Sequence, residues 1–273
     1  MITSQTRLFG VIGDPIGHSL SPVMHNAAFN AMAFPGVYLA FNVQDPAGAL
    51  AGMRALNIQG LSVTIPHKRA VMDYLDKIDP LAVEIGAVNT IALRDGRLEG
   101  FNTDCHGAVA ALSEHFALGG RRAAVLGAGG AARAVGFGLL RAGAHVSIFN
   151  RGRERGAQLA ASLGVGYAPL SEFDGRRFDL VVNTTAAGMT PRTEVSPVPV
   201  DTLHPELLVM DIVYNPLETR LLAAARLKGC AVLDGLEMFV RQGARQLEIW
   251  TGRSAPLMVM RRAVLEILQP AGR

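Results

Sequence analysis

Polar residues beside strand-like segments in the first hundred or so residues have the types and spacing of a binding and proton-transfer site. Thr64 and Lys68 lie at and after the end of GLSVTI (60–65), and Asn89 lies at the start of AVNTIAL (87–93). Asp104 follows RLEGFN (97–102). An ammonium and a carboxylate are groups that can transfer protons. Because strand ends face the ligand crevice of an open α/β sheet, these residues are expected to line one cleft.

Each of these residues alone has a simpler structural explanation, such as a solvated lysine, a turn-forming asparagine or a helix-capping aspartate. The stretch DPIGHSLSPVMHN (14–26) leaves a similar choice between a binding loop and a turn. Pro22 is typical of a first helical residue, so Ser21 is predicted to cap the helix that follows. The two histidines, His18 and His25, invite a metal-binding or acid–base interpretation.

The segment VLGAGGAAR is typical of a dinucleotide-binding turn. It supplies Gly127, Gly129 and Gly130, with Ala132 at the last small position, between a strand-like and a helical segment. We expect Gly127 to form the tight turn, Gly129 to let the backbone approach a pyrophosphate, and the helix N-terminus to bind it. A glycine-rich turn alone is also compatible with a purely structural role, but this strand and helix favour a dinucleotide.

The end of the next strand, HVSIFN (145–150), indicates which dinucleotide binds. NAD enzymes place an acidic residue there for the ribose hydroxyls, whereas this chain has Asn150 and Arg151, followed by Arg153 and Arg155. Guanidinium groups suit the additional phosphate of NADP. A solvated basic turn is the alternative, and the neighbouring glycine turn favours NADP.

The elements that must position these residues form two α/β regions. Strand-like and helical segments alternate from residue 8 to 102, and Asp95-Gly96 predicts a hairpin, so the first sheet should be mixed. A second region opens near Ala123 and predicts a doubly wound sheet. Two helical stretches follow Gly235, and their apolar faces could cover either region.

The composition excludes several classes of protein. The 273 residues fit two domains, and the net charge of +3 is spread among scattered arginines, so neither nucleic acid nor membrane is an expected partner. The two cysteines, Cys105 and Cys230, have no metal-ligand spacing, so no metal site is expected. The sequence has no long uncharged apolar stretch, and we expect a cytoplasmic location.

The complete set of motifs resembles the shikimate dehydrogenase family. The matching segments occur in family order over nearly the whole chain: GDPIGHSLSPVMHN, VTIPHK, GAVNT, GFNTD, GAGGAAR, NR with Arg155, NTTAAGM, DIVYNPLETRLL and DGLEMFVRQGA. The resemblance implies a mixed-sheet substrate domain (1–104 plus 238–273) and a Rossmann-type NADP-binding domain (105–237), with the C-terminal helices returning to the first.

The resemblance also implies the roles of individual residues. Lys68 and Asp104 would be the catalytic pair. The substrate contacts would be Ser19, Ser21, Thr64, Lys68, Asn89, Asp104, Tyr214 and Gln242. The NADP contacts would be Gly127, Ala128, Gly129, Gly130, Ala131, Asn150, Arg151, Arg155, Thr184, Ile212 and Gly235. The chain departs from the common family pattern at Ser62, Gly152 and Ile212.

The implied reaction is the reversible reduction of 3-dehydroshikimate to shikimate by NADPH, a step of chorismate and aromatic amino-acid biosynthesis. A neighbouring carboxylate favours the ammonium form of a lysine, so Lys68 is expected to donate the proton while Asp104 orients it. A small-molecule substrate is the expected partner, and a homodimer is compatible with the family. Two alternatives remain: an enzyme that also uses quinate or NAD, and a non-catalytic metabolite sensor.

Overall fold

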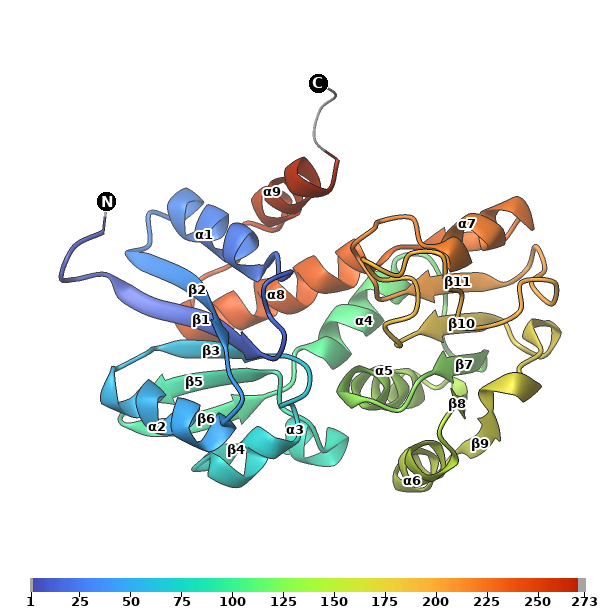
Figure 1. Cartoon of the computed structure of the whole chain (residues 1–273), viewed down its shortest axis with the longest axis horizontal. Coiled ribbons are helices and arrows are strands. Elements are labelled where there is room, and N and C mark those ends of the chain that lie inside the picture. Colours follow the sequence, from blue (N-terminus) through green and yellow to red (C-terminus); the bar gives the residue numbers. More distant parts are fainter. Residues whose placement is uncertain (1, 270–273) are drawn as a thin grey trace. The chain divides into compact units, whose positions relative to one another are not determined.

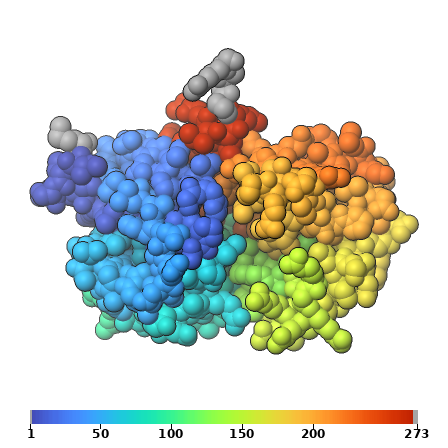
Figure 2. Space-filling view, in the orientation of Figure 1, coloured from blue at the N-terminus to red at the C-terminus, as the bar shows by residue number. Residues whose placement is uncertain are grey.

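The computed structural model describes residues 2–269, and the chain folds into two compact units (Figure 1). Unit 1 consists of the residues up to Thr103 together with those from Val240 onward. Unit 2 runs from Asp104 to Phe239. In the space-filling view, side chains fill the spaces between the ribbons of each unit (Figure 2).

Unit 1 is built on a mixed sheet, as the hairpin signal predicts. Its strands are β1 (Arg7–Gly13), β2 (Gly36–Asn42), β3 (Gly60–Val63), β4 (Lys77–Ile78), β5 (Thr90–Arg94) and β6 (Arg97–Phe101). Their order is β2-β1-β3-β5-β6-β4, and β5 runs antiparallel to both of its neighbours. Asp95 and Gly96 join β5 to β6 with φ angles of 49° and 76°, the left-handed conformation that a two-residue hairpin turn requires.

Local sequence signals explain where the shorter helices of unit 1 begin and end. Asp45 accepts a hydrogen bond from the Ala47 N–H at the start of α2 (Pro46–Ala55), and Asp79 caps α3 (Pro80–Ile85) in the same way. One expected helix is different: KRAVMDYL (68–75) contains only a 3₁₀ turn, Ala70–Tyr74, because the chain then extends to pair β4 with β6.

The C-terminal helices pack against the first sheet. This decides which of the two regions their apolar faces cover. The helix α9 (Leu257–Leu268) packs beside α1 (Ser21–Ala31), as the red and blue ribbons of Figure 1 show. The long helix α8 (Gly235–Thr251) brings Trp250 against β3, where a Cβ on Gly60 would lie 2.4 Å from the indole Nε1. Only glycine leaves room for this close approach.

Unit 2 is a parallel, doubly wound sheet, as predicted. It contains β7 (Arg122–Leu126), β8 (His145–Asn150), β9 (Gly166–Pro169), β10 (Leu180–Asn183), β11 (Leu208–Asp211) and β12 (Ala231–Leu233). Their order is β12-β11-β10-β7-β8-β9, with all pairs parallel. The connections reverse direction beside β7, which creates the switch point at which such sheets bind ligands.

The helices α4 (Asp104–Ser113), α5 (Gly130–Arg141), α6 (Arg153–Leu163) and α7 (Arg220–Leu227) accompany this sheet. The expected apolar face of α5 is confirmed, because Ala132, Val135 and Leu139 are fully buried in the core. The strand β9 is not expected from the sequence, because it is a short edge strand whose residues are at most half-buried.

His25 is part of the core of unit 1 and is no ligand or acid–base group. Its ring stacks on Tyr38 at 4.4 Å between centroids, and the nearby Gln246 side chain favours the protonated ring less than burial disfavours it. Burial lowers the pKa of His25 from 6.5 to about 3. The folded protein therefore holds this histidine neutral at pH values where the unfolded chain protonates it.

This difference predicts a pH-dependent stability. As the pH falls from about 6.5 toward 3, one extra proton bound by the unfolded state should cost about 1.4 kcal/mol of unfolding free energy per pH unit. In His25→Phe the slope should be smaller by this amount, whereas a variant of the exposed His18, His18→Gln, should keep the wild-type slope. Urea unfolding at several pH values between 7 and 4 measures the slope, and equal slopes for wild type and His25→Phe would contradict the assignment.

Candidate functional site

The polar residues of unit 1 gather at one edge of its sheet because of the strand directions. Pairing of Ile12 with Val63 shows that β1 and β3 end at the same edge. Because β5 is antiparallel, its first residue, Thr90, pairs with Ser62 near the end of β3 and with Phe101 at the end of β6. The residues that follow β1, β3 and β6, and those that precede β5, therefore share this edge.

Ser19 lies in the loop after β1, and Ser21 is the first residue of the helix that follows this loop. The helix α1 begins at Ser21 itself, and the Oγ of Ser19 accepts a hydrogen bond from the Ser21 N–H at 3.3 Å. The prediction that Ser21 caps the helix is therefore wrong, because its hydroxyl lies within the first turn and beyond the cap position. The loop after β3, which begins at Thr64, lies next to the end of β1. A Cβ atom added to Gly13, the last residue of β1, would lie only 2.5 Å from the Thr64 Cγ2 atom.

Lys68 lies in the loop after β3, close to the start of β5. Its backbone oxygen accepts a hydrogen bond from the Val88 N–H at 2.8 Å, which places it beside the residue that precedes Asn89. The ring of His67 supports the same loop through a 2.7 Å contact between its Nε2 and the Val43 oxygen. Lys68 is half-buried, so its side chain keeps contact with solvent.

Asn89 is held on several sides at this edge. Its Oδ1 accepts hydrogen bonds from the Thr103 N–H and the Thr90 hydroxyl, both at 2.8 Å. Its Nδ2 donates to the Thr103 hydroxyl at 2.9 Å and to the Oε1 of Gln242 at 3.4 Å. The structure thus brings together two residues, Asn89 and Gln242, that are 153 positions apart in the chain.

Asp104 directly follows Thr103 and is the first residue of α4, where it is 5% exposed. Its place in the chain thus ties it to the edge that holds Asn89. The neighbouring Cys105 is not a nucleophile, because burial raises the pKa of its thiol to about 11.

The candidate cofactor residues all belong to unit 2 and follow the carboxyl ends of its strands. Gly127, after β7, has a φ of 120°, and a Cβ there would lie 2.6 Å from the Thr184 Oγ1 atom, after β10. Gly129 precedes the first residue of α5, Gly130, and a Cβ there would meet nothing within 4 Å. Ala128 and Ala131 complete the turn.

The start of α5 fits a pyrophosphate. Among the described residues, no side chain caps this N-terminus, and its first turn contains no acidic residue. The backbone N–H groups there thus point out of the helix beside a glycine that leaves open space. This arrangement suits the phosphates of a dinucleotide, because unpaired N–H groups and the helix dipole both favour negative charge.

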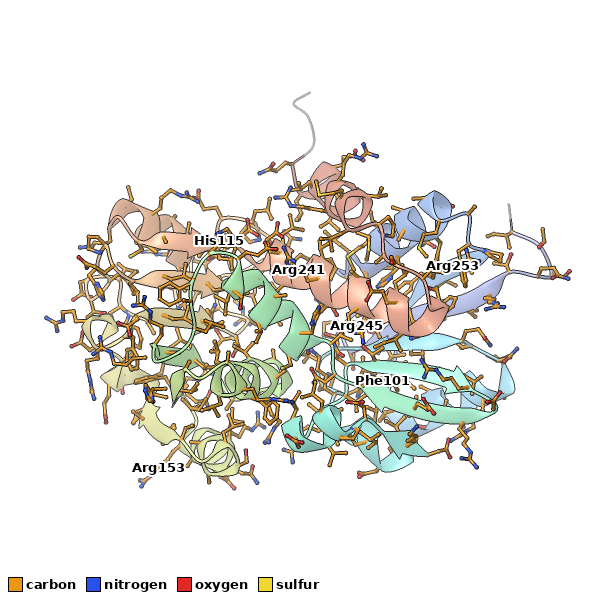
Figure 3. The ribbon with its side chains drawn as sticks, turned by 180° about the vertical axis from the view of Figure 1, so that it is seen from behind. Phe101, His115, Arg153, Arg241, Arg245 and Arg253 are labelled. Atoms are coloured by element: carbon orange, nitrogen blue, oxygen red, sulfur yellow. The ribbon has the colours of Figure 1, made fainter. Side chains whose placement is uncertain are left out.

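The turn after β8 fits an additional phosphate. The Nδ2 of Asn150 donates to the Gly152 oxygen at 2.8 Å, which shapes the turn. Arg151 and Arg155 are exposed on either side of the start of α6, and Arg153 projects outward from its first turn (Figure 3). Guanidinium groups at this position can bind a phosphate on the ribose.

Three further predicted residues follow the last strands. Ile212 follows β11, and a Cβ on Gly235, the first residue of α8, would lie 2.4 Å from the Ile212 oxygen. The ring of Tyr214 stacks on Phe239 at 4.2 Å between centroids. Ile212 and Tyr214 are half-buried, so each has a surface on which a ligand can lie.

Several buried groups that hold these residues in place are not apparent from the sequence. Asp211 is fully buried and accepts hydrogen bonds from Asn183, the Val213 N–H and the Thr219 hydroxyl. Burial raises the pKa of Asp211 to about 6. Ser62 and Gln246 form a comparable buried pair in unit 1. The only signal for Asp211 is its place in DIVYNP, and no local signal identifies Gln246.

The part of the chain that the structure describes contains neither a metal-binding cluster nor a membrane-spanning helix. Within residues 2–269, no group of three or more His, Cys, Asp or Glu side chains is arranged to hold a metal ion. None of the helices in that range has the length and apolar character needed to cross a membrane.

Two family models match this chain. The shikimate dehydrogenase substrate binding domain matches residues 11–91, and the shikimate 5'-dehydrogenase C-terminal domain matches residues 235–265. The chain is 48% identical to the shikimate dehydrogenase (NADP(+)) of Moorella thermoacetica, over 98% of this chain and 95% of that protein.

Solved structures agree with these matches. A crystal structure of a shikimate dehydrogenase in complex with NADP+ is 40% identical, with a TM-score of 0.95 and 98% of each chain covered. The Thermus thermophilus enzyme in complex with NADP(H) and shikimate is 39% identical, with a TM-score of 0.88 and coverage of 94% of this chain and 98% of that one.

The two glycines of the turn should respond differently to an added methyl group. Gly127→Ala should destabilise the protein by about 1–3 kcal/mol, because its positive φ and the nearby Thr184 side chain both exclude a Cβ. Gly129→Ala should leave stability unchanged but weaken NADP+ binding by about tenfold, because open space is filled where the pyrophosphate approaches. Thermal melts and calorimetric NADP+ titrations measure both effects. Unchanged NADP+ affinity in Gly129→Ala would contradict this use of the turn.

Proposed function

The chain belongs to the shikimate dehydrogenase family, and we propose on this premise that it catalyses the reversible NADPH-dependent reduction of 3-dehydroshikimate to shikimate. The observation that carries the proposal is the polar edge of unit 1. There the strand directions collect hydroxyl, amide and ammonium groups suited to a carboxylated, polyhydroxylated ring. Residues 1–104 with 238–273 bind the substrate in this proposal, and residues 105–237 bind NADP.

Each group at the polar edge has a role in substrate binding. The hydroxyls of Ser19 and Ser21 donate hydrogen bonds to the substrate carboxylate, and Thr64, Asn89 and Gln242 bind the ring hydroxyls. Tyr214 completes the proposed substrate contacts. These neutral groups suit the ligand because they satisfy its oxygens in a partly buried site without adding charge.

Proton transfer is assigned to Lys68 and Asp104. Bound NADPH supplies the hydride that reduces the carbonyl carbon. As the carbonyl oxygen gains negative charge, the ammonium of Lys68 stabilises it and donates the proton that completes the alcohol. The Asp104 carboxylate orients the lysine and a substrate hydroxyl, and Lys68 then regains a proton from solvent. In the oxidative direction Lys68 accepts the proton instead.

The cofactor preference follows from the turn after β8. Arg151 and Arg155 provide cations for the 2′-phosphate of NADP, and Asn150 stands where NAD enzymes carry a carboxylate. The reaction places the enzyme in chorismate and aromatic amino-acid biosynthesis. The two free cysteines are compatible with a reducing cytoplasm, and the protein could act as a monomer or a homodimer.

A four-way assay tests the proposed function. NADP+ and NAD+ reduction are followed by the absorbance of the reduced nicotinamide, with shikimate and with quinate as substrates, and shikimate with NADP+ should give the highest kcat/KM. A higher value with quinate or with NAD+ would assign the chain to the broader quinate/shikimate enzymes. Absence of turnover in all four combinations would favour the metabolite sensor.

Substitutions should separate proton transfer from binding. Lys68→Ala should lower kcat for shikimate oxidation by about 100-fold with a much smaller change in KM, because the proton is transferred only in the transition state. Ser21→Ala should mainly raise KM, because its hydroxyl binds the carboxylate throughout. The exposed Lys77, which pairs with Glu99 at 3.6 Å, gives a control: Lys77→Ala should change neither constant. A near-normal kcat in Lys68→Ala would contradict the assignment.

A further inference from the structure

One face of α8 is hydrogen-bonded to the start of β5 at three successive turns. Gln242, Gln246 and Trp250 are spaced four residues apart and therefore lie on the same face of the helix. Their partners are consecutive in β5 and just before it: Gln242 contacts Asn89, Gln246 contacts Asn89 and Thr90, and Trp250 donates to the Ile91 oxygen at 3.0 Å. Figure 3 marks this part of α8 by Arg241 and Arg245, the chain neighbours of Gln242 and Gln246.

Gln246 is the middle contact and belongs to a buried chain of hydrogen bonds with a single direction. The Tyr38 hydroxyl donates to the Ser62 Oγ at 2.6 Å, and the Ser62 hydroxyl donates to the Gln246 Oε1 at 2.8 Å. The Gln246 Nε2 then donates to the Thr90 Oγ1 at 3.1 Å and to the Asn89 backbone oxygen at 3.2 Å. Gln246 is 2% exposed, so water cannot replace these partners without a cost.

The chain of hydrogen bonds ends on the Asn89 side chain and sets its orientation. Because Thr90 Oγ1 accepts from Gln246, its one hydroxyl proton is directed to the Asn89 Oδ1. The Thr103 N–H, which can only donate, meets the same oxygen. Turning the Asn89 amide over would place its NH₂ group against both donors. Asn89 must therefore present its NH₂ group toward the Thr103 hydroxyl, at 2.9 Å, and toward Gln242, at 3.4 Å.

We propose that Gln246 is a positioning residue for the substrate site. Its Nε2 orients the Thr90 hydroxyl, which donates to the Asn89 Oδ1. It also holds α8 against the start of β5 one helical turn after Gln242. The side-chain amides of Asn89 and Gln242 therefore keep fixed orientations. The proposal rests on the proposed function, because Asn89 and Gln242 are taken as substrate contacts.

The test compares Gln246→Leu with Trp250→Phe, which removes a different hydrogen bond between α8 and β5 and leaves the hydrogen bonds of Gln246 in place. Wild-type oxidation of shikimate with NADP+ is measured first, and its absence would reject the proposed function rather than this inference. Given wild-type activity, Gln246→Leu should raise KM for shikimate by about tenfold while kcat and KM for NADP+ stay within about threefold. Trp250→Phe should lower the melting temperature and leave KM for shikimate unchanged.

A double-mutant cycle separates a connected chain of hydrogen bonds from independent packing effects. Ser62→Ala should raise KM for shikimate by about threefold, and the Ser62→Ala/Gln246→Leu double variant should be no worse than Gln246→Leu alone. Calorimetric titration of shikimate should show the same order of affinities.

Three outcomes would overturn the proposal. The first is a folded Gln246→Leu variant with KM for shikimate within about twofold of wild type. The second is an equal rise of KM in Trp250→Phe. The third is full additivity in the double variant. If Gln246→Leu does not fold, the Ser62→Ala variant tests the proposal alone. A KM for shikimate equal to that of the wild type in Ser62→Ala would then reject the role of this chain of hydrogen bonds.

Discussion

The proposed substrate-binding edge of unit 1 depends on one constraint, which is that β5 runs antiparallel to the other strands of its sheet. If β5 were parallel to β3, Asn89 would lie at the opposite edge from Lys68, because Asn89 precedes β5 whereas Lys68 follows β3. The Asp95-Gly96 turn, with its two positive φ angles, makes the reversal and returns β6 to the same edge. Asp104 then follows shortly after the end of β6, at Phe101. A tight turn at the opposite edge of the sheet thus returns the chain to the edge from which Asp104 follows.

The two sheet edges recognise their proposed ligands by different means. At the edge of unit 1, side-chain amides and hydroxyls are oriented by buried hydrogen bonds, which suits a ring with several hydroxyls that must be distinguished. At the edge of unit 2, a glycine turn exposes backbone N–H groups, which suits a pyrophosphate because its oxygens are all acceptors. The buried Asp211 gives that edge rigidity through hydrogen bonds to Asn183 and Thr219.

Features that depend on neighbouring residues could be predicted from the sequence. These include the hairpin at Asp95-Gly96, the glycine turn at Gly127 and the buried face of α5. Features that depend on distant partners could not, since Gln246 lies 184 residues from Ser62 and nothing in the pattern around either indicates the other. The capping role expected of Ser21 failed because a shift of one residue at the helix start changes which side chain meets the N–H groups.

Side-chain amide NMR of shikimate binding tests the central claim, that the polar edge of unit 1 is the substrate site, most directly. With the ¹⁵N-labelled protein, saturating shikimate without cofactor should shift the amide resonances of Asn89 and Gln242 and leave the backbone N–H signals of Gly127 and Gly129 in place. NADP+ alone should move the glycine signals. Shikimate that leaves Asn89 and Gln242 unshifted, or that moves the glycine turn instead, would contradict the account.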